Sequence, residues 1–304
     1  MSDIMSFTSI VKNEISKLES KEAENISELS AIFRNISIVQ NSIKITTENA
    51  SVARRIFSLI KETFFITPKI IVRRGYNFNK NYIYILEINK KVTEIINELE
   101  INSNIPRQYI YSDEQLARAY LRGVFLSCGS INDPKKSRYH LEFIVDNEEY
   151  ADFISSLLNQ FDLNSKVLKR ENKYMIYMKE AEKISDFLRL MQAIQAVFYY
   201  EDIRIYRDHK NMTNRLNNCE QANVDKIIET AMNQLKDIKK IEDADAFDLL
   251  DEKTKEAAIY RKKYPETSLL ELSEIISIET GNTITKSGLY HRFHKIKEFA
   301  QKIK

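Results

Sequence analysis

The spacing of apolar residues changes repeatedly between a helical and a strand-like period in residues 29–99. Apolar residues three and four apart share one face of a helix, whereas alternation is typical of a strand with one buried face. Val52, Ile56 and Leu59 follow the first pattern, and residues 82–88 (YIYILEI) follow the second. The elements predicted here are helices at 29–37, 49–64 and 91–99 and strands at 38–47, 69–74 and 82–88.

A second stretch of the chain repeats this order of patterns. Glu171 and Asn172 separate its last two strand-like runs and suit a tight hairpin turn. Three helices and three strand-like runs are bounded in each stretch. We interpret both stretches as α-β-β-α-β-β-α, which indicates an internal duplication. The elements predicted in the second stretch are helices at 121–129, 147–161 and 180–191 and strands at 139–145, 165–170 and 173–179.

From Glu201 onward the sequence shows only helical patterns and no strand-like ones. Residues 221–240 predict a long polar helix with an apolar stripe that includes Ile228, Ala231 and Leu235. A cluster of three helices at a C-terminus is a recurrent format of DNA-binding domains. The three shorter helical segments are predicted at 253–264, 268–277 and 286–303.

These patterns predict an α+β fold in which a duplicated scaffold precedes an all-α domain. The length of 304 residues fits about two domains. The expected parts are an N-terminal segment at 1–21 with no assigned element, a scaffold domain at 22–200, a helical linker at 201–251 and a helix-turn-helix domain at 252–304.

Helix-end signals support the helix-turn-helix interpretation. Ser268 and Glu271 have the spacing of a capping box, in which each side chain bonds to the other residue's backbone amide. The pair Gly281 and Asn282 interrupts the helical pattern, and Thr285 is a suitable N-cap for the last helix. The sequence therefore predicts two helices joined by a turn near the C-terminus.

The last predicted helix has an apolar side, from Leu289 through Phe293 to Ile303, and a polar side. A recognition helix needs this division, because one side packs on its domain while the other reaches bases and phosphates. Arg292 could form a bidentate contact with a guanine edge, whereas Ser287, Tyr290 and the lysines suit phosphates. The alternative is an ordinary exposed helix with a basic tail. The candidate DNA-binding residues are Ser268, Lys286, Ser287, Tyr290, His291, Arg292, His294, Lys295 and Lys297.

A second polar group lies in residues 203–215. If this stretch is helical, its side chains could follow phosphates, contact another domain, or satisfy the backbone of a loop. These three interpretations stay open at the level of sequence. The residues concerned are Arg204, Arg207, Asn211, Asn214 and Arg215.

Composition narrows the classes of protein and chemistry. With 43% hydrophobic and 30% charged residues, the chain is typical of a globular protein, and no run is long and apolar enough for a membrane span. Two cysteines and four histidines make a disulfide framework or zinc site unexpected, so we expect no metal and no cofactor. A cytoplasmic, nucleoid-associated location fits these features. The formal net charge of +2 does not by itself indicate a nucleic-acid partner.

Five segments carry a resemblance to a known family. The chain resembles, over nearly its whole length, the WhiA family of bacterial sporulation and cell-division regulators. The asparagine-rich segment is the most specific of the five. The segments are residues 47–56 (TENASVARRI), 120–132 (YLRGVFLSCGSIN), 139–142 (YHLE), 211–223 (NMTNRLNNCEQAN) and 285–295 (TKSGLYHRFHK).

The resemblance implies a LAGLIDADG homing-endonuclease-like scaffold followed by a helix-turn-helix domain. It also implies a regulator of transcription that binds double-stranded DNA and is linked to cell division and chromosome segregation. Two departures are visible: Ile36 and Ser37 replace a polar residue and glycine, and residues 278–282 form a longer turn.

The resemblance also indicates that nuclease chemistry is lost. In such scaffolds each of two paired helices delivers a carboxylate to catalytic metal ions. The matching positions here are Ile36 and Cys128. Isoleucine is no ligand, and a thiolate is too soft for magnesium. Glu28 lies two helical turns before Ile36, too far to substitute.

Three functions are therefore compared. The leading hypothesis is a non-catalytic, DNA-binding transcription regulator. The second is an interaction scaffold that docks a regulator or division protein, with DNA contact secondary. The third is a residual endonuclease, against which Ile36 and Cys128 argue. The operator, the regulated genes, the sign of regulation and the oligomeric state do not follow from the sequence.

Overall fold

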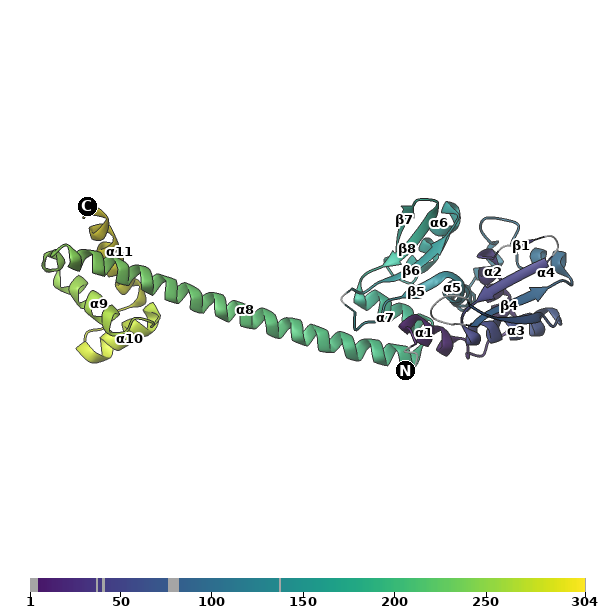
Figure 1. Ribbon diagram of the computed structural model, residues 1–304, viewed down its shortest axis with the longest axis horizontal. Coiled ribbons are helices and arrows are strands. Elements are labelled where there is room, and N and C mark those ends of the chain that lie inside the picture. Colours follow the sequence, from purple (N-terminus) through teal and green to yellow (C-terminus); the bar gives the residue numbers. More distant parts are fainter. Residues whose placement is uncertain (1–4, 37, 40–41, 76–81, 137, 304) are drawn as a thin grey trace. The chain divides into compact units, whose positions relative to one another are not determined.

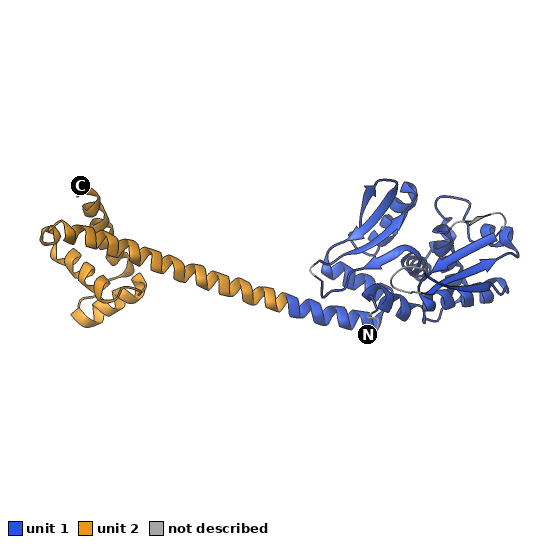
Figure 2. Ribbon diagram, viewed as in Figure 1, with its two compact units in different colours: residues 1–207 blue, residues 208–304 orange. Residues whose placement is uncertain are grey.

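The protein is described from a computed structural model in two compact units, residues 1–207 and 208–304 (Figure 2). Unit 1 is mixed helix and sheet, and unit 2 is helical. The described residues are 5–36, 38–39, 42–75, 82–136 and 138–303.

Unit 1 contains one order of elements twice (Figure 1). The first set is α2 (Glu22–Arg34), β1 (Ile38–Val39), β2 (Ser42–Thr47), α3 (Ala50–Phe64), β3 (Lys69–Arg74), β4 (Tyr82–Ile88) and α4 (Val92–Glu98). After a 3-10 helix, η1 (Gln108–Tyr111), the second set is α5 (Glu114–Cys128), β5 (Gly129–Ile131), β6 (Leu141–Val145), α6 (Glu148–Asn159), β7 (Lys166–Arg170), β8 (Lys173–Met178) and α7 (Ala181–Leu190). The predicted duplication is confirmed.

Each half forms a four-stranded antiparallel sheet with the same strand order, β1-β2-β4-β3 and β5-β6-β8-β7. Ile43 on β2 lies opposite Ile88 on β4, and Leu141 on β6 lies opposite Met178 on β8. All four side chains are buried in one hydrophobic core that spans both halves. Because a slip of one residue would turn these side chains to the other face, burial fixes the register.

Helices α2 and α5 lie side by side and join the two halves (Figure 1). Their close approach depends on Gly123. A Cβ atom at this position would lie 2.3 Å from the carbonyl oxygen of Glu28 and 2.9 Å from the Cβ of Ala31. A larger residue at position 123 would therefore push the two helices apart.

A further helix, α1 (Phe7–Ile15), lies in the N-terminal segment to which the sequence analysis assigns no element. Phe7, Val11 and Ile15 are four residues apart and are buried in the core of unit 1. The hydroxyl of Thr8 donates to the carbonyl of Ile131 at 2.9 Å. The polar composition of this segment conceals a narrow apolar stripe, which is sufficient to attach a short helix to a core.

Unit 2 includes most of α8 (Ile194–Asp243). A linker was expected at 201–251. Instead, α8 begins before this range, at Ile194, and its last turns belong to the core of unit 2. Ala231, Ile238 and Ile241 of α8 are buried, the last two in the hydrophobic cluster of unit 2. The remaining elements are η2 (Phe247–Leu249), α9 (Glu252–Lys263), α10 (Leu269–Thr280) and α11 (Lys286–Lys302), which confirm the three predicted C-terminal helices.

Candidate nucleic-acid interface

The ends of α10 and α11 are fixed by local backbone contacts. The Ser268 hydroxyl accepts from the amide of Glu271 at 3.2 Å, and the Glu271 carboxylate accepts from the amide of Ser268 at 2.9 Å. Gly281 ends α10 with φ of 70°, a left-handed conformation that favours glycine. Thr285 accepts from the amide of Gly288 at 3.1 Å. The predicted capping box, the interruption at Gly281 and the N-cap are confirmed, whereas residues 278–280, expected within a longer turn, are the last residues of α10.

The apolar side of α11 packs on α9 and α10. Leu289, Phe293, Ile296 and Ala300 are buried, and Ile303 is partly buried against the same cluster. Their spacing of three and four residues places them on one side of the helix. The predicted inner face of the last helix is therefore confirmed, and it fixes which side of α11 faces outward.

Most of the candidate DNA-binding side chains lie on the outward side of α11. Two have an acidic neighbour: Lys295 Nζ lies 3.6 Å from Asp251 Oδ2, and His294 Nδ1 lies 3.5 Å from Glu298 Oε1. The outward side of α11 is thus mainly basic and rich in hydrogen-bond donors. The exposed candidates are Lys286, Ser287, Tyr290, His291, His294, Lys295 and Lys297.

Arg292 is placed differently from the other candidates. Its Nη1 donates to the Glu256 carboxylate at 2.7 Å and to the Lys253 carbonyl at 3.1 Å. Its side chain is 20% exposed. In this conformation Arg292 ties α11 to α9. Glu256, the partner that holds it, was not singled out from the sequence, because the two residues are 36 positions apart.

Ser268 also has a defined structural role. Its hydroxyl caps α10, so this hydroxyl acts first on its own helix. A second contributor that the sequence analysis missed is Arg261, which is 1% exposed. Arg261 donates to the Gln234 side chain at 2.9 Å and to the Thr267 carbonyl at 2.6 Å. Burial lowers the pKa of this guanidinium. Arg261 thereby joins α8, α9 and the turn before α10.

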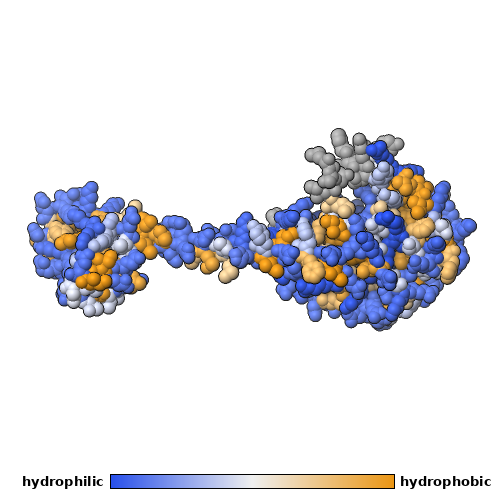
Figure 3. Space-filling model, turned by 90° about the horizontal axis from the view of Figure 1, so that it is seen from below, coloured by the Kyte–Doolittle hydropathy of each residue, from blue (hydrophilic) through white to orange (hydrophobic). Residues whose placement is uncertain are grey.

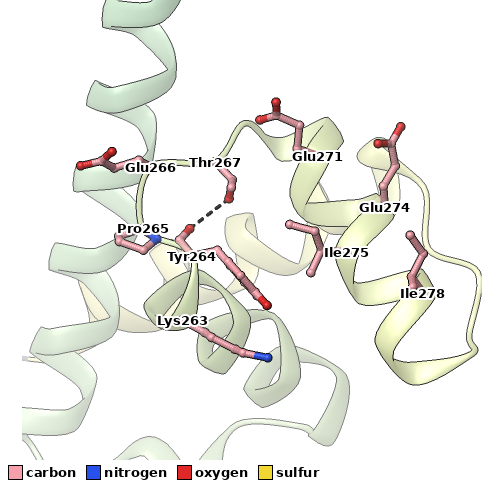
Figure 4. Close-up of a pocket in the computed structure, with 9 residues that line it drawn as sticks. All are labelled: Lys263, Tyr264, Pro265, Glu266, Thr267, Glu271, Glu274, Ile275 and Ile278. Atoms are coloured by element: carbon pink, nitrogen blue, oxygen red, sulfur yellow. Dashed lines mark hydrogen bonds between the residues drawn. The ribbon is translucent and has the colours of Figure 1, made fainter.

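A cleft of about 620 Å³ beside α10 does not suit DNA (Figure 4). The side chains of Glu266, Glu271 and Glu274 line it together with Ile275 and Ile278. Three carboxylates against the single ammonium of Lys263, which is paired with Glu279, would repel phosphates, whereas the outward side of α11 is mainly basic. Within unit 2, the outward side of α11 therefore has the basic charge that contact with phosphates would need, and the cleft beside α10 does not.

The second polar group, predicted in residues 203–215, lies on α8, as the helical pattern required. Arg204 pairs with Glu201 at 2.8 Å. Arg207 donates to the carbonyls of Pro134 and Lys136 at 2.8 and 2.7 Å, and it lies over the ring of Tyr139 at 4.4 Å. Arg207 therefore satisfies the backbone of a loop in unit 1, one of the three interpretations left open.

The other members of this group face solvent. Asn211, Asn214 and Arg215 are exposed and line a hollow on α8 together with Asp208 and Asn218. Their contact with a phosphate or another domain stays a prediction.

The ends of α2 and α5 carry no pair of carboxylates. Asn35 donates to the Ser127 hydroxyl at 3.0 Å, and Cys128 ends α5. Burial raises the pKa of the Cys128 thiol to about 11, so the thiol is protonated at neutral pH. Lys12 of α1 donates to the Leu126 carbonyl at 3.1 Å. Residue 37, one of the two departures noted in the sequence, lies outside the described residues.

Glu28 is a buried carboxylate that is already occupied. It is 0% exposed and accepts from Arg55 at 2.8 and 2.9 Å and from Arg122 at 2.7 Å. Two guanidinium groups leave this carboxylate no role as a metal ligand. Within the described ranges, no three histidine, cysteine, aspartate or glutamate side chains cluster as a metal site would need. No helix in the described part of the chain has the length and hydrophobicity to cross a membrane.

The fold and the C-terminal helices define a protein that joins a duplicated LAGLIDADG-like scaffold to a helix-turn-helix unit. Two solved structures share this fold. The crystal structure of full-length DUF199/WhiA from Thermatoga maritima aligns with a TM-score of 0.58 and 24% identity, over 99% of both chains. The N-terminal LAGLIDADG domain of DUF199/WhiA aligns with a TM-score of 0.50 and 22% identity, over 63% of this chain and 93% of that one.

Three family models match the chain, and the chain belongs to the WhiA family. A relative in Oceanobacillus iheyensis, named "Probable cell division protein WhiA", is 41% identical over 99% of this chain and 98% of its own length. A relative of the same name in Bacillus cytotoxicus is 42% identical with the same coverage. The models are the WhiA N-terminal LAGLIDADG-like domain at 22–102, the WhiA LAGLIDADG-like domain at 117–210 and the WhiA C-terminal HTH domain at 213–300.

Proposed function

We propose that this protein is a non-catalytic transcription regulator that binds double-stranded DNA through α11. The carrying observation is the division of α11, whose apolar side is buried in the helix-turn-helix unit while seven candidate side chains are exposed. The length of the helix and its donor-rich outward side fit the major groove. The relatives' name, a probable cell division protein, supports a regulatory role in that process.

The side chains of α11 divide into two kinds of contact. Lys286 and Lys297 contact phosphates, which position the helix without reading sequence. Ser287 and Tyr290 join the lysines on phosphates, and His291, near the N-terminal half of α11, contacts base edges. Arg292 holds α11 on α9 through Glu256, so reading a guanine with this side chain would first require breaking that ion pair.

The regulatory role and the loss of catalysis are tested separately. A chain without metal-binding carboxylates at the ends of α2 and α5 leaves supercoiled plasmid intact in Mg²⁺ or Mn²⁺, and reproducible nicking would contradict this part of the proposal. Occupancy of division and chromosome-segregation promoters in cells, together with altered transcripts after deletion, tests the regulatory part.

Charge-removing variants test the position of the interface. Fluorescence anisotropy with labelled genomic duplexes measures the affinity of the wild type, of Lys286→Ala/Lys297→Ala and of the control Lys239→Ala. Lys239 is an exposed lysine of α8 in the same unit. Each lost phosphate contact should weaken binding about equally for all sequences and lower the slope against log salt by about 1. Equal losses of affinity in the control and in the double variant would show that α11 does not form the DNA-binding surface.

A second candidate function is docking of a protein partner by the scaffold. On the outer face of the second sheet Ile144 and Leu168 are 40% and 45% exposed, in one row with Met175. The variant Ile144→Ser/Leu168→Ser should keep its affinity for DNA. If the scaffold docks a partner, this variant should lose division function in cells, and unchanged function would dismiss this candidate.

A further inference from the structure

One stretch of α8 is helical without support from another element. Every residue of 208–230 is exposed except Ile227, which is partly buried. Asparagine is a weak helix former. Helices in proteins gain most of their stability from packing an apolar face, which this exposed stretch does not do within the described part of the chain. A fully helical stretch of this composition is therefore expected to pack against another helix or another protein surface. Its asparagines are Asn211, Asn214, Asn217, Asn218 and Asn223.

A narrow seam runs along this stretch. Met212, Leu216 and Cys219 follow each other at intervals of four and three residues, and His209 and Asn223 continue the interval in both directions. Met212 is 63% exposed and Leu216 is 55% exposed. Figure 3 shows hydrophobic residues among the hydrophilic ones on the surface of α8. An average interval of 3.5 residues is the spacing of a two-stranded coiled coil.

The seam positions have the chemistry of a parallel pair. In heptad terms His209, Leu216 and Asn223 are at a positions, while Met212 and Cys219 are at d positions. A single asparagine at an a position costs stability but fixes register and favours two parallel strands. Cys219 would then face Cys219 of the second copy.

The charged residues beside the seam favour a second copy of α8 as the partner and a parallel orientation of the two helices. Arg215 lies at g and Glu220 at e, five residues later. In a parallel pair of identical helices, g of one helix lies beside the following e of the other. Arg215 would therefore pair with Glu220 of the second copy, twice by symmetry. In an antiparallel pair g positions face g positions, so Arg215 and Glu220 would lie on different flanks.

We propose that residues 208–230 of α8 form a short parallel coiled coil with a second copy of this chain. The seam is short and interrupted by His209 and Asn223, so the dimer is weak and depends on protein concentration. Dimerisation would present two copies of α11 on one particle. The proposal stands independently of DNA binding, because its readout is the mass of the protein alone.

Sedimentation equilibrium of the full chain over a range of concentrations tests the seam. The wild type should show a monomer–dimer equilibrium, and Leu216→Lys should raise the dissociation constant on the order of tenfold or more, since a lysine would enter the seam. Met232→Lys is the matched control: Met232 is 65% exposed on α8 and lies off the seam. A wild type that stays monomeric, or a dimer indifferent to Leu216→Lys, would overturn the proposal and leave the seam to a different protein.

Charge exchange and cross-linking test the direction. Arg215→Glu and Glu220→Arg should each weaken the dimer, and the double exchange should restore it. Mild oxidation should give a disulfide-linked dimer on a non-reducing gel, retained in Cys128→Ser and lost in Cys219→Ser. A double exchange that fails to restore the dimer, together with no cross-link through Cys219, would exclude the parallel arrangement.

Discussion

Replacing Glu28 with glutamine should destabilise unit 1 strongly. Glu28 is 0% exposed and lies between Arg55 and Arg122, whose side chains are 8% and 7% exposed. The three residues come from α2, α3 and α5, so their contacts join the two halves of the scaffold. Glutamine keeps the size of the side chain and removes only its charge.

The size of the effect follows from burial. Removing one member of a buried ion pair leaves an uncompensated charge and costs about 3–5 kcal/mol. Here two guanidinium groups lose their counter-charge, and Glu24, 3.8 Å from Arg122, offers partial compensation. We therefore expect a loss of about 3 kcal/mol or more in the free energy of unfolding.

Urea unfolding monitored by far-UV circular dichroism measures this loss in the full chain. The control is Glu94→Gln, because Glu94 is 57% exposed and pairs with Lys91 on the surface. Such exposed pairs contribute at most about 1 kcal/mol. A loss below about 1 kcal/mol for Glu28→Gln would refute the view that this carboxylate is essential to the joining of the halves.

Three further predictions concern stability, each read by denaturant unfolding. Gly123→Ala should cost about 1–3 kcal/mol, since its Cβ would lie 2.3 Å from the carbonyl oxygen of Glu28, whereas Gly288→Ala, with its nearest atom at 3.4 Å, should change little. Ser268→Ala should cost unit 2 about 1 kcal/mol through the lost cap. Burial lowers the pKa of Lys12 to about 8, so between pH 8 and 10.5 the unfolded chain binds the extra proton at this lysine, which makes stability rise with pH. Above about pH 9 the Cys128 thiol, whose pKa burial raises to about 11, opposes this rise. Lys12→Met should lack that rise, and an identical slope in both proteins would exclude Lys12 as its source.

The repeating fold could be predicted because its pattern is local. The strand at 82–88 follows from local alternation, and the caps at Ser268 and Thr285 depend on residues three positions away. The helix α1 escaped prediction because only three apolar residues form its buried stripe, too few to stand out in a polar segment.

Contacts between distant residues could not be predicted. Glu28 and Arg122 are 94 positions apart, and nothing in the local pattern pairs them. The outward position of Lys286 follows from helical periodicity, but the attachment of Arg292 to Glu256 depends on how α9 packs against α11. Periodicity gives the face of a helix, whereas tertiary packing decides which charged side chains on its flanks are used within the fold.

The salt dependence of DNA binding tests the central claim most directly. Fluorescence anisotropy with a labelled genomic duplex, repeated from low to high salt, gives the slope of log affinity against log salt for the wild type and for Lys286→Ala/Lys297→Ala. The account predicts salt-sensitive binding by the wild type and a slope smaller by about 2 in the double variant. Salt-insensitive binding, or equal slopes in the two proteins, would contradict DNA recognition through α11.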